Sequence, residues 1–155
     1  MQLSGTYIFD ADQQTVWSLL MDPTAIAQAI PGVDELIPVE GETLAWRATA
    51  KIGIASVSGA YAGIVKMSEV QPPNQYRLTV SGEGQQSIIN GTALMKLSYD
   101  NEQQKTVLSW DAEANVSGKL AGIGQRLIGA AANMLGRQFF TAIAKQLPAR
   151  QQPHT

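Results

Sequence analysis

Apolar and polar positions alternate through the middle of the chain, between residues 33 and 116. The clearest run has apolar side chains at every second position: Leu44, Trp46, Ala48, Ala50 and Ile52. Alternation with this period predicts strands that bury one face. Short turns, such as Pro72-Pro73-Asn74 and residues 100–104, separate about six such strands, which favours an antiparallel meander. A shorter alternating run at residues 3–9 predicts one further strand at the start of the chain.

Two short helices are predicted between this first strand and the meander. Asp12 suits the N-cap of the first, because its carboxylate can accept a backbone N–H of the opening turn. Asp22-Pro23 predicts the start of the second, with proline at the first helical position. Pro31-Gly32 ends that helix, which therefore covers only about residues 24–30.

A long C-terminal helix is predicted over roughly residues 118–147, with Ser117 as its N-cap and Pro148 after its end. Its apolar stripe is Leu120, Ile123, Leu127, Ala131, Met134, Leu135 and Ile143. Several glycines interrupt this segment, and each costs a helix about 1 kcal/mol relative to alanine. Two explanations stay open: a slim helix that leaves a cavity beside the sheet, or close helix–sheet packing through small residues.

The order of these elements predicts an α+β helix-grip fold, in which a curved antiparallel sheet of about seven strands wraps around the long C-terminal helix. We expect one ligand-binding domain over residues 1–147 and a flexible tail over 148–155. The chain has 155 residues, of which 45% are hydrophobic and 15% charged, so disorder is excluded.

Composition removes several classes of function. The net charge is −2 and no cluster of lysine or arginine occurs, which argues against nucleic-acid binding. Without cysteine there is no thiolate catalysis, and the single histidine, His154, cannot build a multi-histidine metal site or a serine–histidine triad. The N-terminus lacks a signal-peptide pattern and no apolar span is long enough to cross a bilayer, so we expect a cytoplasmic protein.

Candidate ligand contacts come from the apolar positions expected to face inward. Aromatic and methionine side chains there line a ligand pocket or fill an ordinary core, and both interpretations stay open. Ile26 and Ile30, on the helix between two prolines, close the mouth of such a pocket or merely attach that helix to the core. The expected lining residues are Ile26, Ile30, Trp46, Tyr61, Met95, Trp110, Leu120, Leu127, Ala131, Met134 and Leu135.

Polar candidates for chemistry are few. Asp111 and Glu113 fall on the outward face of the last predicted strand, where a solvated surface is favoured over an acid/base pair. Arg126 and Arg137, on a similar side of the last helix, meet an anionic headgroup or simply face solvent. We therefore expect no catalytic residue, no metal site and no tightly bound cofactor.

Motifs along residues 2–147 resemble the CoxG family of carbon-monoxide dehydrogenase proteins, within the START/polyketide-cyclase (SRPBCC) helix-grip superfamily. They include Val16-Trp17, Asp22-Pro23 and Ile30-Pro31-Gly32 in the first part of the chain. The most specific stretch is residues 114–128, and the order and spacing of its residues carry the resemblance: Ala114, Val116, Gly118-Lys119-Leu120-Ala121, Gly124 and Arg126-Leu127-Ile128.

This resemblance implies a non-catalytic accessory protein of a molybdenum hydroxylase such as carbon-monoxide dehydrogenase. It implies an apolar cavity for a quinone or lipid, and a part in membrane recruitment, electron-acceptor supply or maturation of the hydroxylase. The expected partners are hydroxylase subunits, a hydrophobic small molecule and, transiently, the inner face of the plasma membrane. The alternatives are a polyketide cyclase or aromatase-like enzyme in the same cavity, and a pure protein–protein adaptor.

Overall fold

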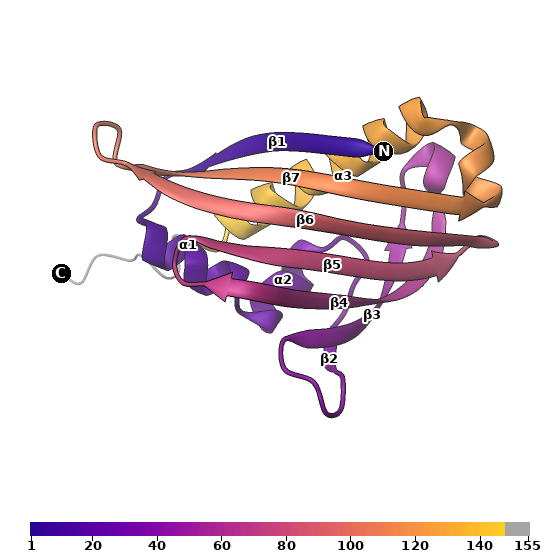
Figure 1. The fold of residues 1–155 in the computed structure, drawn as a ribbon, viewed down its shortest axis with the longest axis horizontal. Helices are drawn as coiled ribbons and strands as arrows, with labels where there is room; N and C mark the ends of the chain where they lie inside the picture. The colour runs from indigo at the N-terminus through magenta and orange to yellow at the C-terminus, as the bar shows by residue number, and fades with distance from the viewer. Residues whose placement is uncertain (148–155) are drawn as a thin grey trace.

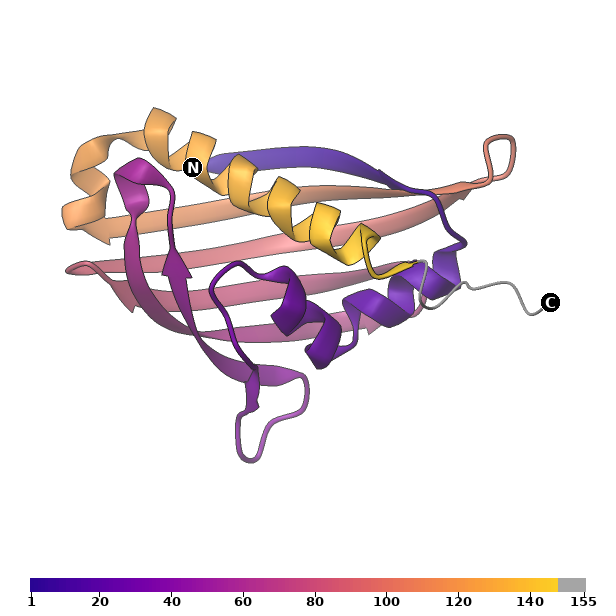
Figure 2. The same ribbon diagram turned by 180° about the vertical axis from the view of Figure 1, so that it is seen from behind.

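The computed structural model describes residues 1–147 and consists of one curved sheet with its helices on one face (Figures 1 and 2). Seven antiparallel strands follow the order β1-β7-β6-β5-β4-β3-β2. Their bounds are β1 Gln2–Phe9, β2 Ile37–Pro38, β3 Ala45–Ile52, β4 Gly59–Gln71, β5 Gln75–Gly84, β6 Ser87–Asp100 and β7 Lys105–Gly118. The predicted fold class is confirmed; the expected tail, residues 148–155, lies outside the described residues.

The helices are α1 (Gln13–Leu20), α2 (Pro23–Ala29) and α3 (Gln125–Ala144), with 3₁₀ turns η1 (Ala55–Val57) and η2 (Lys119–Ile123). Figure 2 shows α3 crossing the concave face of the sheet, with α1 and α2 at one end of it. The meander pairs each strand from β3 to β7 with its sequence neighbour, and β1 closes the order by pairing with β7. This curved layer and the helix in front of it enclose whatever space the side chains leave.

Side-chain caps fix both short helices where the sequence predicts them. Asp12 accepts a hydrogen bond from the Thr15 N–H at 3.2 Å, at the N-terminus of α1. Asp22 accepts one from the Thr24 N–H at 2.9 Å, and Pro23 opens α2. Each cap satisfies a backbone donor that the first helical turn leaves without a partner.

The last helix begins later than the sequence predicts. Strand β7 continues through Ser117 to Gly118, and η2 follows before α3 starts at Gln125. Gly118 and Gly124 have φ angles of +87° and +92°, a region that L side chains rarely adopt. The prediction of one helix from 118 to 147 capped by Ser117 is therefore wrong, because these two glycines turn the backbone out of helical geometry.

A large cluster of buried side chains fills one end of the molecule, where α1, α2 and the C-terminal part of α3 meet the sheet. Phe9, which is fully buried, lies 4.7 Å from the ring of Tyr7 and 6.4 Å from that of Phe140, between ring centroids. Trp17 and Tyr76 stack edge to face with their centroids 5.6 Å apart. We call this group of buried residues the main cluster.

Candidate functional site

A second, smaller cluster lies at the opposite end of the concave face, where η1 and η2 meet α3. Its buried members are Val57, Leu120 and Ala131, and it is called here the distal cluster. The partly buried side chains packed against it are Ile52, Ile54, Tyr61, Ile89, Val116 and Ile123. The concave face therefore holds two separate apolar clusters rather than one continuous core.

Inward-facing residues between the two clusters are only half buried and pack against neither. These residues line what we call the inter-cluster gap, and the set is Ala50, Val65, Val80, Ala112, Ile128 and Leu135. Neighbouring inward positions on the strands are occupied by glycine, including the cross-strand pair Gly63 and Gly82. Short side chains here leave space that a long-chain core would fill.

The path of α3 keeps this gap open. Its close neighbours are α2, β1, η1 and η2, and no central strand from β4 to β6 is among them for the part of the chain described. Gly136 lies one turn before the buried Phe140, yet a Cβ added to it would meet no atom within 4 Å. A residue on a packed helix face would contact its neighbours at that distance. The glycine at 136 is thus not explained by close packing on the sheet.

The chemistry of this region is apolar. On the described strands, no charged side chain occupies an inward position; the alternation places lysine, arginine and carboxylates on the outward face. The Tyr61 hydroxyl donates to the Val57 carbonyl at 2.6 Å, and burial raises the pKa of Tyr61. The buried Ser87 hydroxyl accepts from the Leu120 N–H at 2.8 Å. Residues 1–147 hold no group of three metal-binding side chains.

The residues predicted to line a pocket divide between these regions. Ile26, Trp46 and Met95 are buried in the main cluster, with Ile30 and Trp110 packed against it. Tyr61, Leu120 and Ala131 belong to the distal cluster, and Leu135 lines the gap. The structure therefore brings most of the set to the concave side, at its two ends.

Leu127 and Met134 depart from that prediction. Their exposed fractions are 49% and 47%, so both lie on the solvent side of α3. The late start of α3 explains the difference, because Leu120 and Ile123 of the predicted stripe belong to η2 and do not fix which side of α3 faces the sheet. The inward residues Ile128 and Phe139 were missed in favour of their neighbours.

Asp111 and Glu113 lie on the outward face of β7, exposed and one pleat apart. Glu113 forms an ion pair with the Met1 amino group, at 3.1 Å between nitrogen and Oε1. A solvated strand face describes this pair, as the sequence favoured.

Comparison with known proteins identifies the family. Residues 5–148 match the family model of CoxG, the G component of carbon monoxide dehydrogenase. The chain belongs to the CoxG family. A conserved protein from Geobacillus kaustophilus is similar to it in structure, with a TM-score of 0.90, 34% identity and 96% of each chain covered. No curated protein matches the chain.

More distant structures share the fold of this CoxG-family chain. A START superfamily protein from Mycobacterium smegmatis superposes with a TM-score of 0.71 at 12% identity, covering 97% of this chain and 99% of the other. The structure of Ara h 8.0201 gives 0.72 at 14% identity, with 96% and 98% covered. At these identities the likeness shows the helix-grip fold alone.

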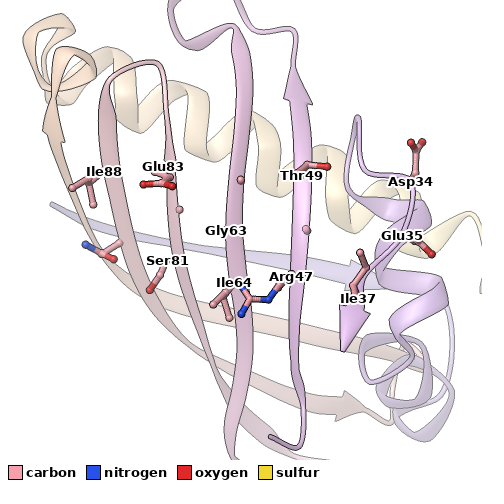
Figure 3. Close-up of a pocket in the computed structure, with 14 residues that line it drawn as sticks. Asp34, Glu35, Ile37, Arg47, Thr49, Gly63, Ile64, Ser81, Glu83 and Ile88 are labelled. Carbon is pink, nitrogen blue, oxygen red and sulfur yellow. The ribbon is translucent and has the colours of Figure 1, made fainter. Parts of the chain in front are cut away.

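A groove on the opposite, outward face of the sheet was not foreseen from the sequence. Figure 3 shows it between the segment that carries Asp34 and Glu35 and the outward side chains of β3 to β6. Its volume is about 680 Å³, and a second hollow of about 650 Å³ shares Thr49, Ala62, Glu83 and Ile88 with it. The available signal was an isoleucine at an outward position: Ile88 is 54% exposed.

Proposed function

We propose that this CoxG-family protein takes up a hydrophobic ligand, a quinone or a lipid, in the inter-cluster gap. The observation that carries the proposal is the combination of an uncharged inward face with half-buried side chains that pack against neither cluster. Transferring apolar ligand surface out of water stabilises a complex by about 25 cal/mol per Å². Ligand sites in proteins are concave and largely apolar, with few polar groups to orient the ligand.

The family description supports an accessory role beside carbon monoxide dehydrogenase or a related molybdenum hydroxylase. We propose that the bound ligand assists electron-acceptor supply, maturation or recruitment of that enzyme to the inner face of the plasma membrane, through a transient contact. The inward face offers no carboxylate, lysine, arginine or histidine among the described strand residues to act as general acid or base. Binding rather than catalysis is the function that this arrangement favours.

Native mass spectrometry of the purified protein tests the proposal directly. We expect a co-purifying apolar compound, and added short-chain quinone should quench the fluorescence of Trp110, beside the gap. Gly136→Phe places a ring where an added Cβ meets open space, so this variant should fold and bind the quinone at least roughly tenfold more weakly, as expected when a bulky group replaces ligand volume.

Asn133→Phe is the matched control, because residue 133 is exposed on the same helix. It should bind as the unmodified chain does. Equal binding by Gly136→Phe and the unmodified chain would place the ligand elsewhere. A protein that carries no apolar compound and binds no quinone would instead favour the adaptor function.

A further inference from the structure

Charge is divided unevenly along the chain. All 13 acidic residues precede position 114, whereas Lys119, Arg126, Arg137 and Lys145 follow it. The last part of the chain, which includes η2 and α3, is therefore net positive although the whole protein is net negative. Such an asymmetry orients a protein toward an anionic surface.

The elements that surround α3 do not neutralise this charge. Between their bounds, α2, β1, η1 and η2 contain no aspartate or glutamate. Within residues 1–147, the ion pairs join Met1 to Glu113, Lys66 to Glu42, Arg77 to Glu69 and Lys105 to Asp10. None of these pairs uses a cation of α3, so that charge is available to an external partner.

Large apolar side chains share the solvent side of α3 with these cations. The spacing of Leu127 and Met134 is two helical turns, and that of Arg126 and Arg137 is three. Lys145 follows directly after the helix, eight residues beyond Arg137. These five residues are called here the basic face. In Figure 2 no other element lies in front of α3, so this face is uncovered.

A hollow of about 430 Å³ adjoins the basic face, between α2 and α3. Met134, Arg137 and Lys145 line it from the side of α3, and Gln28 and Ala29 line it from α2. Two cations beside an apolar floor suit a phosphate with a hydrocarbon chain attached, since the cations attract the phosphate and the floor accepts the chain.

We infer that the basic face of α3 docks on the surface of a bilayer containing anionic phospholipid. Arginine and lysine attract the lipid phosphates, while Leu127 and Met134 enter the boundary between headgroups and acyl chains. The idea that docking delivers ligand rests on the proposed function: α3 covers the inter-cluster gap, so contact through its outer side brings the gap to the membrane.

Flotation with vesicles tests this surface on the full chain. Vesicles of phosphatidylglycerol and phosphatidylcholine should bind the protein, and vesicles of phosphatidylcholine alone should bind it weakly. Arg126→Gln, Arg137→Gln and Lys145→Gln together should lower the partition coefficient roughly 30- to 100-fold, from about a fivefold loss for each cation near the surface. High salt should lower binding of the unmodified chain in the same way.

The matched control removes Arg47, Lys51 and Lys96 in the same manner. These three exposed cations lie on the outward face of the sheet, and no described ion pair uses them. This variant should bind vesicles within about twofold of the unmodified chain, because its cations lie beyond the roughly 10 Å range of screened contacts with a bilayer at α3. Leu127→Ser with Met134→Ser should weaken binding while leaving its salt dependence.

Equal losses in the two charge variants, or no loss in either, would overturn the inference. So would failure of the unmodified chain to bind anionic vesicles, a result that would leave an acidic protein surface as the occupant. The short-chain quinone assay without vesicles separates this outcome from the proposed function. The basic-face variant should bind that quinone normally, and loss of quinone binding by the unmodified chain would contradict the proposed function alone.

Discussion

The two ends of the concave face differ in how they hold α3. At one end, the main cluster combines three helices, fully buried aliphatic side chains and four contacting aromatic rings of Tyr7, Phe9, Phe139 and Phe140. Gln146 adds a hydrogen bond from its Nε2 to the Ala25 carbonyl at 3.0 Å. At the other end, the distal cluster has three buried residues and two 3₁₀ turns. One end anchors α3, and the other holds it by few contacts.

This difference assigns separate tasks to the two ends. Regions with few buried contacts open at lower free energy than the cores of the same proteins. The distal cluster, whose η2 connects β7 to α3, can therefore separate from the sheet while the main cluster stays folded. Opening at the distal end gives a hydrophobic ligand a way into the gap that does not require global unfolding.

The largest expected effect lies in the main cluster. Phe9→Ala removes a fully buried ring that contacts Tyr7 and Phe140, and should lower the free energy of unfolding by about 3–5 kcal/mol. Urea unfolding followed by far-UV circular dichroism measures the change. A loss below about 1 kcal/mol, typical of exposed positions, would show that this end is not the anchor.

Leu120→Ala tests the distal cluster and should cost less, about 2 kcal/mol, because partly exposed neighbours can collapse into the cavity. Amide hydrogen exchange should quicken in η1 and η2 and stay nearly unchanged in α1 and the strands beside it. Equal quickening at both ends would mean that the two clusters unfold as one unit, and the contrast between them would fail.

Alkaline pH should act on the main cluster through Tyr76, which is fully buried. Burial raises the pKa of its phenol above the ordinary value of about 10. Above that pH the unfolded chain loses the phenolic proton while the folded chain keeps it, so stability is present below about pH 10 and falls as the pH rises further. Unfolding curves at increasing pH measure this fall, and Tyr76→Phe should make it shallower. An unchanged slope in that variant would assign the fall to other groups.

Local signals in the sequence predict much of this architecture. The carboxylates of Asp12 and Asp22 cap the helices that they were expected to cap, and alternation places Trp46 and Met95 on the buried face. Each of these predictions depends on residues close in sequence or on a period that a strand enforces. The antiparallel order of the meander follows from its short turns.

Features that depend on backbone geometry at a few glycines could not be predicted. Apolar periodicity continues across Gly118 and Gly124, so only their positive φ angles reveal that η2 interrupts the helix. That interruption decides which side of α3 faces the sheet, and hence the exposure of Leu127. The outward groove depends on how the sheet curves near Gly63, where a side chain would collide with the backbone of β5.

The smallest predicted effect concerns the glycine that borders the gap. Gly136→Ala should raise the free energy of unfolding by about 0.5–1 kcal/mol, because alanine favours the helix and its Cβ meets no atom within 4 Å. Gly124→Ala is the matched comparison: its Cβ also meets nothing within 4 Å, but its φ is +92°, so this variant should lose about 1–2 kcal/mol. Thermal unfolding of the two variants side by side measures both signs. Destabilisation by Gly136→Ala would mean that α3 rests on the sheet at this position, and the gap between the two clusters would be closed.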